Sequence, residues 1–267
     1  MAKGNRGGKR TSGVSGGSGA VAATQNANVQ PQNVQVDNTQ PAKSMGASYE
    51  AFMKMTDDQK ADAIDTAVSQ GVPAHLSQSP FQKFTYNSDM NDKPTVVDDS
   101  VLDSMNGTEI FRTVNNVYDS KTDLNYTAPD IANQVRYGTK TRYSDSGGSA
   151  YGRGLYFADD YGESVNWYGN TTGNIQKTAV MRAKLNANAK TIDISSVRSG
   201  LSREMASGSK LGKTLKKIYS KDDASAESIY ALSKGYNVII SGSGYFNVLN
   251  RNAMTMSKTI HSKGSEW

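Results

Sequence analysis

The sequence predicts an α+β fold, in which short strands and short helices follow one another without a regular repeat. Two apolar stretches, "EIFRTV" and "YNVIIS", have the length and composition of strands. Two others, "TDDQKADAIDTAVSQGVP" and "TAPDIANQVRYG", place apolar residues at helical spacing behind capping residues. A doubly wound parallel sheet needs strands and helices in regular alternation, so this irregular order favours an α+β architecture.

The composition carries no metal or membrane signature. The 267 residues allow one large domain or two small ones. There is no cysteine and there are only two histidines, so we expect neither disulfides nor a bound metal. No apolar run approaches the roughly 20 residues of a transmembrane helix, and the basic N-terminus is not followed by the apolar segment of a secretory signal. We therefore expect no membrane partner.

Residues 1–45 are expected to form a disordered tail. They are rich in Gly and Ser and then in Gln and Asn, with no Leu, Ile or aromatic residue, so they cannot bury enough apolar surface to offset their ordering entropy. Five basic residues face one aspartate here, and the tail thus carries four of the five net positive charges of the chain. The nearly neutral remainder argues against a nucleic-acid partner. The alternative is an arm that orders against a capsid, a membrane surface or nucleic acid.

Folded structure is expected from Tyr49, as an N-terminal helical subregion over residues 46–104 and a main domain over residues 105–267. A capping box of Thr56 and Gln59 begins the first long helix, and one short helix is expected before Tyr86.

In the main domain, Thr127 and Asp130 cap a helix that reaches Gly138. The other elements are strands at 107–116 and 155–158, a helix from Asp159 to Gly169, two strands around an Asn-rich turn, two lysine-bearing helices (201–207 and 209–220), a helix closed by Gly235, and final strands joined by the turn Gly242–Gly244.

Arg112 lies inside the otherwise apolar strand at 107–116. On strand periodicity, Ile110 and Arg112 share one face while Phe111 and Thr113 share the other. The side chain needs a partner, which is either a carboxylate within the fold or an anionic ligand held by the guanidinium.

The stretch "YGRGLYFADDYGESVNWYG", residues 151–169, resembles the central motif of ADP-ribosyltransferases, especially the diphtheria-toxin and poly-ADP-ribose polymerase branch. "EIFRTV" resembles the family's first strand, "AVMRAKLNANAKTID" the strands after the motif, and "ALSKGYNVIISGSGYFNVLNRNAM" its closing hairpin. The resemblance covers residues 105–260. It implies an ADP-ribosyltransferase-like split antiparallel β-sandwich with flanking short helices.

The resemblance also implies an activity, in which the nicotinamide–ribose bond of NAD is cleaved and ADP-ribose passes to a nucleophile. Tyr156 would stack on the nicotinamide, Arg112 would contact the ribose or diphosphate, and the backbone of Thr113 would hold the carboxamide. Further contacts to NAD are implied for residues of the central motif: Gly152, Arg153, Gly154, Phe157, Ser164 and Tyr168. We expect a mono-ADP-ribosyltransferase of phage or mobile-element origin that modifies a host protein in the host cytoplasm.

One departure concerns the glutamate that the family carries at the start of its closing hairpin. Gly244 stands at the expected position, before Tyr245, and Asn247 supplies no charge. A carboxylate there stabilises the positive charge that develops on the ribose. Substitute acids are expected among four residues of the main domain: Asp159, Asp160, Glu163 and Glu227. Of these we assign Glu163 as the catalytic acid.

A second hypothesis follows from the same departure. A chain that keeps the fold without the glutamate could be a catalytically silent, structural protein. It would be associated with the virion before delivery, through contacts of residues 1–45 with capsid or other virion proteins. A third and weaker hypothesis is a nucleic-acid-binding protein that uses the basic tail.

Overall fold

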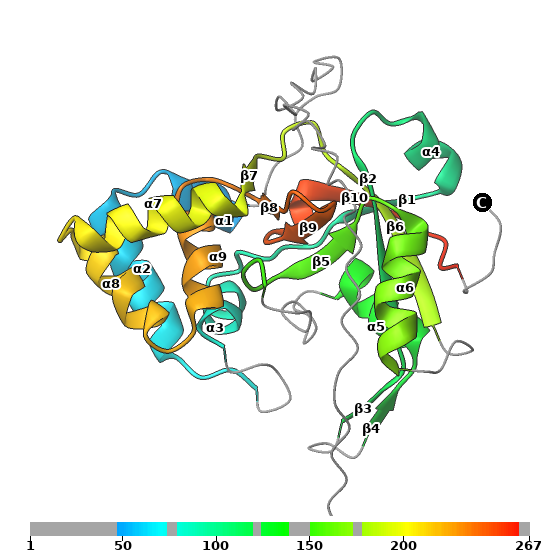
Figure 1. Ribbon diagram of the computed structural model, residues 1–267, viewed down its shortest axis with the longest axis horizontal. Helices are drawn as coiled ribbons and strands as arrows, with labels where there is room; N and C mark the ends of the chain where they lie inside the picture. The colour runs from blue at the N-terminus through cyan, green and yellow to red at the C-terminus, as the bar shows by residue number, and fades with distance from the viewer. Residues whose placement is uncertain (1–46, 74–78, 120–123, 139–149, 173–177, 262–267) are drawn as a thin grey trace, which may run out of the picture. The chain divides into compact units, whose positions relative to one another are not determined.

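The computed structural model describes residues 47–73, 79–119, 124–138, 150–172 and 178–261 (Figure 1). All of them belong to one compact unit, Asp37–Trp267. The tail predicted at residues 1–45 lies outside the described residues. Among the residues described, no helix is long and apolar enough to cross a membrane.

The described residues contain an eight-stranded mixed sheet with the strand order β1-β10-β6-β2-β5-β9-β8-β7. Its strands have these bounds: β1 Thr95–Val97, β2 Glu109–Asn115, β5 Leu155–Ala158, β6 Thr178–Leu185, β7 Thr191–Asp193, β8 Val238–Ile240, β9 Tyr245–Val248 and β10 Met254–Ser257. The two outermost pairs, β1–β10 and β7–β8, are parallel and the inner pairs are antiparallel. β3 (Val117–Asp119) and β4 (Leu124–Tyr126) form a separate hairpin.

The sheet is nearly divided between β2 and β5. β2 pairs with β6 over its whole length, from Glu109 to Asn115. It pairs with β5 at one position, Phe111 with Ala158. Since β5 pairs along its whole length with β9, the sheet consists of two well-bonded halves that meet at a narrow seam. The chemistry-bearing residues predicted from the sequence lie on both sides of this seam.

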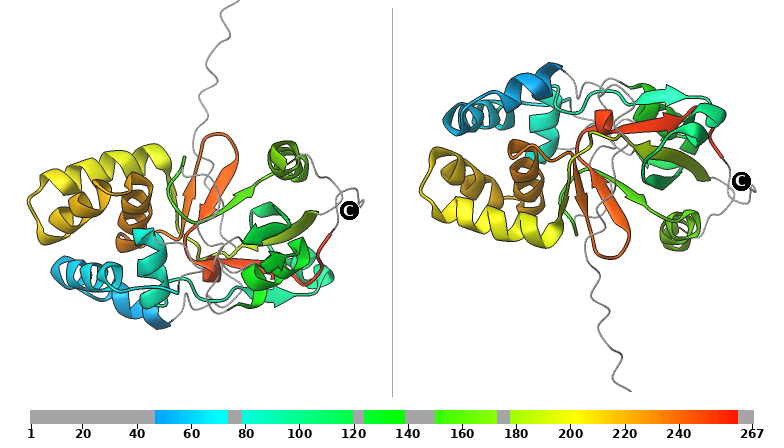
Figure 2. Two further views of the ribbon diagram at one scale, coloured as in Figure 1. Left: turned by 90° about the horizontal axis from the view of Figure 1, so that it is seen from below. Right: turned by 90° about the horizontal axis from the view of Figure 1, so that it is seen from above.

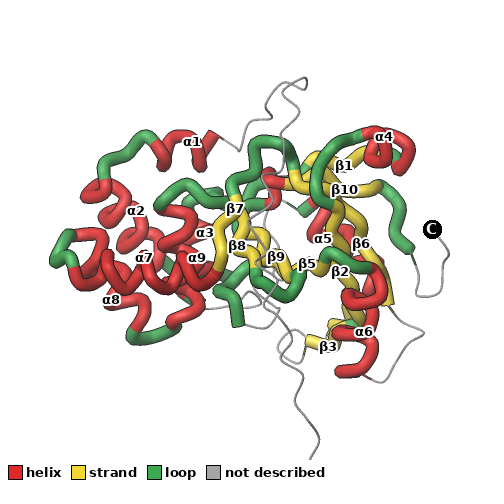
Figure 3. The backbone as a smooth tube through the Cα atoms, turned by 45° about the horizontal axis from the view of Figure 1, so that its top comes forward, coloured by secondary structure: helices red, strands yellow, loops and turns green. Residues whose placement is uncertain are grey.

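The helices form two groups at the two ends of the sheet (Figures 1 and 2). Near β7 and β8 lie α1 (Ala47–Met53), α2 (Asp57–Ser69), α3 (Pro80–Asn87), α7 (Ile194–Ala206), α8 (Lys210–Tyr219) and α9 (Asp223–Ser233). Near β2, β6 and β10 lie α4 (Asp99–Ser104), α5 (Ala128–Tyr137) and α6 (Tyr161–Thr172) (Figure 3). One helical group thus contains α1, α2 and α3 of the N-terminal subregion as well as α9, whose last residues belong to the segment that resembles the family's closing element.

The predicted caps are present. Thr56 Oγ1 accepts the backbone N–H of Gln59, whose side chain accepts the N–H of Thr56. Thr127 and Asp130 form the same reciprocal pair at the start of α5. Each cap satisfies two N–H groups that a helix start leaves without an intrahelical partner. The mixture of short helices with a mostly antiparallel sheet confirms the α+β class.

Several predicted boundaries are wrong. α6 does not end at Gly169 but continues to Thr172, because a glycine inside a helix costs only about 1 kcal/mol and ends it only in a cap conformation. α7 begins at Ile194 rather than 201, with Asp193 as its cap. The closing segment is interrupted by a 3₁₀ turn at Arg251–Ala253. β1 and α4 were not predicted, since their short segments carry little periodic signal.

The core is continuous from the sheet into the helical group near β7. Fully buried side chains on the helices, such as Ile64, Phe81 and Leu215, belong to the same cluster as Ile110 and Ile239 on the strands. The predicted N-terminal subregion therefore packs against the rest of the unit, and Lys60 Nζ of α2 donates to the carbonyl of Ser233 in α9.

Candidate functional site

Tyr156 lies in β5 with its hydroxyl fixed by the chain just before the strand. The hydroxyl donates to the carbonyl of Gly152 at 2.6 Å and accepts the N–H of Tyr151 at 2.9 Å. Burial raises the pKa of Tyr156 well above its usual value, so the phenol stays neutral and keeps both bonds. The Gly152–Gly154 turn thus fixes the aromatic ring that follows it.

The register between β5 and β9 shows which side chains share the face of Tyr156. Tyr156 pairs with Asn247 and Ala158 with Tyr245, and directly paired residues of antiparallel strands project to the same side. The ring of Tyr151 lies 6.3 Å from that of Tyr156 and stacks at 6.3 Å on that of Tyr245. We call the surface formed by Tyr151, Tyr156, Tyr245 and Asn247 the Tyr156 face.

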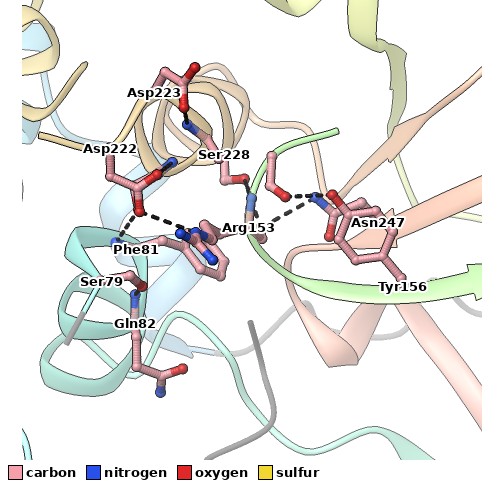
Figure 4. Close-up of polar contacts among 12 residues, drawn as sticks. Ser79, Phe81, Gln82, Arg153, Tyr156, Asp222, Asp223, Ser228 and Asn247 are labelled. Carbon is pink, nitrogen blue, oxygen red and sulfur yellow. Dashed lines mark hydrogen bonds and ion pairs between the residues drawn. The ribbon is translucent and has the colours of Figure 1, made fainter. Parts of the chain in front are cut away.

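Asn247 holds the turn from the β9 side. Its Nδ2 donates to the carbonyls of Tyr151 at 2.7 Å and Arg153 at 3.3 Å. The side chain is 1% exposed, and Oδ1 has no hydrogen-bond partner among the described residues. From α9, Ser228 Oγ donates to the carbonyl of Arg153 and accepts its N–H, both at 2.7 Å (Figure 4). The turn is therefore clamped between a strand and a helix.

The two glycines of the turn are needed for close approach within the protein. Gly152 has a φ of 85°, and a Cβ placed on it would lie 2.5 Å from Ser228 Oγ. A Cβ on Gly154 would overlap the side chain of Asn247. The space that the sequence assigned to a ligand beside these glycines is thus filled by protein atoms, and their contact with NAD stays a prediction.

Gly152→Ala is expected to destabilise the protein by about 2–4 kcal/mol, because it adds backbone strain and a steric overlap at Ser228. Gly208 is a matched control, with a φ of 74° and no heavy atom within 4 Å of the place that a Cβ would take. Gly208→Ala should cost only the strain, about 1–2 kcal/mol. Urea unfolding of both variants measures the difference. Equal losses would contradict the close packing of the turn.

Arg153 points away from the Tyr156 face. Its Nε contacts Asp222 Oδ2 at 3.1 Å, at the start of α9, and Figure 4 shows the guanidinium on the side of the turn away from Tyr156. An arginine held by an aspartate in this way is oriented toward the helical group. Its predicted contact with NAD at the Tyr156 face would need this ion pair to break.

Arg112 is 2% exposed and bridges the seam of the sheet. Its Nη1 donates to the carbonyl of Tyr156 at 2.7 Å, one residue beyond the position where β2 and β5 pair. Of the two explanations that the sequence left open, a partner within the fold is present, and one such partner is this backbone carbonyl. The guanidinium therefore positions β5, and with it Tyr156.

Thr113 and Ser164 connect β2 to α6. Both side chains are buried, and their hydroxyl oxygens lie 2.9 Å apart. Phe157 is 2% exposed and belongs to the hydrophobic core, and its contact with NAD stays a prediction. Tyr168 lies in the later part of α6, where only the backbone is described, so its predicted contact falls outside the described side chains.

Glu163 is the candidate acid that contacts the Tyr156 face. Its Oε1 accepts a hydrogen bond from the Tyr245 hydroxyl at 3.3 Å. Burial raises the pKa of Tyr245, and the charge of Glu163 raises it further. An exposed carboxylate on α6 is thus joined to Tyr245, the residue directly after the position where the family resemblance led us to expect a glutamate.

The other three candidate acids have structural partners. Asp160 Oδ1 accepts the N–H of Glu163 at 2.8 Å and caps α6. Glu227 is buried in α9 and pairs with Arg198 at 2.7 Å, while burial raises its pKa. The N–H of Asp159 donates to the carbonyl of Gly244 at 3.0 Å, and its carboxylate occupies the space beside that glycine.

The strand pairing also shows that the residue opposite Tyr156 is not the one that the sequence suggested. Gly244 precedes the strand with a φ of 79° and faces Asp159. The residue directly opposite Tyr156 is Asn247. Counting along the hairpin sequence could not reveal this, because the side of a strand on which a residue lies depends on its register. Tyr151 and Ser228 were also missed, since nothing in the sequence links α9 to the turn.

No group of three or more His, Cys, Asp or Glu side chains within the described ranges could hold a metal ion. The site therefore consists of aromatic rings, hydroxyls, one buried amide, one buried guanidinium and the carboxylate of Glu163. No family model, no curated protein and no solved structure matches this chain.

Proposed function

We propose that the protein is an NAD-dependent mono-ADP-ribosyltransferase that transfers ADP-ribose to a host protein. The observation that carries the proposal is the convergence of the motif residues. The strands with Arg112, Tyr156 and Asn247 are consecutive neighbours, β2, β5 and β9. From α6, Ser164 contacts Thr113 and Glu163 contacts Tyr245. Segments that resemble separate motifs of the family thus surround the seam of the sheet, and the nearly divided sheet agrees with the split sandwich that the resemblance implies.

The residues suit the chemistry of this reaction. The ring of Tyr156, held by its hydroxyl, offers a fixed surface for the nicotinamide. The hydroxyls of Thr113 and Ser164 can hydrogen-bond a carboxamide once the hydrogen bond between them is broken. The carboxylate of Glu163 can accept a ribose hydroxyl and stabilise the positive charge that develops as the nicotinamide leaves. Arg112 acts as a positioning residue, and its contact with the ribose or diphosphate stays a prediction.

Incubation with labelled NAD and host lysate tests the proposal. Tyr156→Ala and Glu163→Gln should each lower label transfer by about 100-fold or more. Glu163→Gln should keep the rise in melting temperature that NAD causes, because it removes charge stabilisation rather than the binding surface. Asp58→Asn, which changes an exposed carboxylate in α2, is the control and should leave transfer unchanged. Full transfer by Glu163→Gln would exclude Glu163 as the acid.

Asn247 favours a second candidate function. Its side-chain amide lies in β9 opposite Tyr156, and the amide nitrogen Nδ2 donates to the carbonyl of Tyr151 beside the Gly152–Gly154 turn. Such a strand suits a protein that binds NAD without efficient transfer and acts as a structural component, with residues 1–45 in contact with capsid or other virion proteins. An NAD-induced rise in melting temperature without label transfer would support this candidate. Absence of both would exclude NAD as the ligand.

A further inference from the structure

A cavity of about 760 Å³ lies between α2, α3 and the connection from α8 to α9. Its size is in the range of small-molecule sites, roughly 300–1,000 Å³. The charged and aromatic side chains that line it are Lys83, Arg153, Tyr219, Lys221, Asp222 and Asp223. Arg153 is the only one of these that belongs to the Gly152–Gly154 turn, so the cavity lies behind the turn as seen from Tyr156.

Two of these cations have no ion-pair partner among the described residues. The ammonium groups of Lys83 and Lys221 form no ion pair or hydrogen bond with any described residue. Other lysines nearby do form ion pairs. Lys210 pairs with Asp62 of α2 at 2.6 Å, and Lys217 pairs with Asp65 of α2 at 3.3 Å. The lining therefore holds three cations against two carboxylates, a net charge of +1, and two of its ammonium groups are open to an anionic ligand.

The two carboxylates of the cavity do not cancel these charges directly. Asp222 Oδ2 is occupied by Arg153 at 3.1 Å and by the hydroxyl of Ser225 at 2.8 Å. Asp223 Oδ1 accepts the N–H of Ala224 at 2.7 Å, which leaves its second oxygen for a hydroxyl donor. Tyr219 is 45% exposed, so a large part of its side chain is accessible to a ligand.

We propose that this cavity binds a nucleotide. Its phosphates would lie between Lys83 and Lys221, where two ammonium groups replace the hydration of the anion. Its base would stack on the exposed ring of Tyr219, and a ribose hydroxyl would donate to Asp223. This site is separate from the Tyr156 face and does not depend on the proposed transfer reaction.

Arg153 connects the two sites. Its guanidinium lines the cavity, while its backbone is held by Ser228 and Asn247 next to the carbonyl that fixes the Tyr156 hydroxyl. A phosphate that draws Arg153 away from Asp222 would act on the turn itself. The nucleotide is therefore expected to be an effector of the Tyr156 face.

Isothermal titration of the full chain with ADP, pyrophosphate, inorganic phosphate and adenosine tests the cavity. ADP should bind saturably, and more tightly than pyrophosphate, phosphate or adenosine. Lys83→Gln and Lys221→Gln should each weaken ADP binding about tenfold. Tyr219→Ala should weaken ADP about fivefold or more and leave pyrophosphate unchanged.

Lys213→Gln is the matched control, since Lys213 is an exposed lysine of α8 outside the cavity. It should leave ADP binding unchanged, even if NAD proves not to bind. An equal loss in Lys213→Gln would indicate non-specific charge attraction and overturn the proposal. Loss of ADP binding in Tyr156→Ala together with unchanged binding in Lys83→Gln and Lys221→Gln would assign the nucleotide to the Tyr156 face instead. Absence of saturable ADP binding would also overturn it.

Discussion

Asn247→Asp is expected to destabilise the protein by about 2–5 kcal/mol at neutral pH. The substitution changes almost no volume, but it replaces a donor by an acceptor. The Nδ2 group of Asn247 donates to the carbonyls of Tyr151 and Arg153. A carboxylate oxygen in its place would face two carbonyl oxygens in a site that is 1% exposed. Both carbonyls would lose a donor, and a buried charge would have no partner.

The pH dependence gives this prediction a second, independent test. The carboxyl group that Asn247→Asp introduces could, once protonated, still donate to the carbonyl of Tyr151, so folding would raise its pKa above the unfolded value of about 3.9. A carboxyl group whose pKa is raised by folding favours the folded state at low pH and loses that contribution as the pH rises. The loss of stability relative to the wild type should therefore be smaller at pH 5 than at pH 7 in urea unfolding.

Asn133→Asp is the control for the chemical change alone. Asn133 is exposed, and its Oδ1 accepts a bond from Arg136 at 2.7 Å, so a carboxylate is tolerated there. Its effect should stay within about 0.5 kcal/mol. A similarly small effect of Asn247→Asp at both pH values would mean that Asn247 does not hold the turn, and a carboxylate could then be placed opposite Tyr156 without loss of the fold.

Local features of the fold could be predicted from the sequence. The caps at Thr56 and Thr127, the strand Leu155–Ala158 and the hairpin turn before Tyr245 depend on neighbouring residues only. Their signals are short-range hydrogen bonds, periodicity and glycine positions. The contribution of tertiary contacts is clearest in α7, which begins seven residues before the predicted start and buries Val197 in the core.

Some residues of the candidate site could be predicted from the sequence, but their geometry could not. The sequence identified Tyr156, Ser164 and Glu163, which the structure brings to the seam. It could not show that Arg153 turns toward Asp222, or that Asn247 rather than Gly244 lies opposite Tyr156. Both facts depend on strand register and on a helix 75 residues away in sequence, where Ser228 binds the turn. Such contacts between distant segments produce no periodic pattern in the sequence.

Arg251 is a further buried residue whose long-range contacts the sequence could not reveal. Its substitution is expected to cause the second large loss of stability. The sequence singled out Arg112, yet Arg251 is also fully buried, at 0% exposure. Its guanidinium donates to the carbonyl of Val135 at 2.8 Å, at the end of α5, and to the side chain and carbonyl of Asn91 at 3.1 Å each. It lies in the 3₁₀ turn between β9 and β10. Arg251 therefore fixes the chain where it crosses from one half of the sheet to the other.

Arg251→Met keeps most of the volume but removes the guanidinium donor of both carbonyls, and it leaves the amide oxygen of Asn91 with only the backbone N–H of residue 251 at 3.3 Å. We expect a loss of about 3–5 kcal/mol, measured as a lower urea midpoint with an unchanged slope. Arg251→Lys should recover part of it, because one ammonium can still reach either α5 or Asn91 but not both. Because the crossing lies between β9 and β10, any NAD-induced rise in melting temperature should shrink in both variants. A loss below about 1 kcal/mol in Arg251→Met would show that the two halves of the sheet hold their seam without this arginine, and that Arg112 alone aligns β2 with β5.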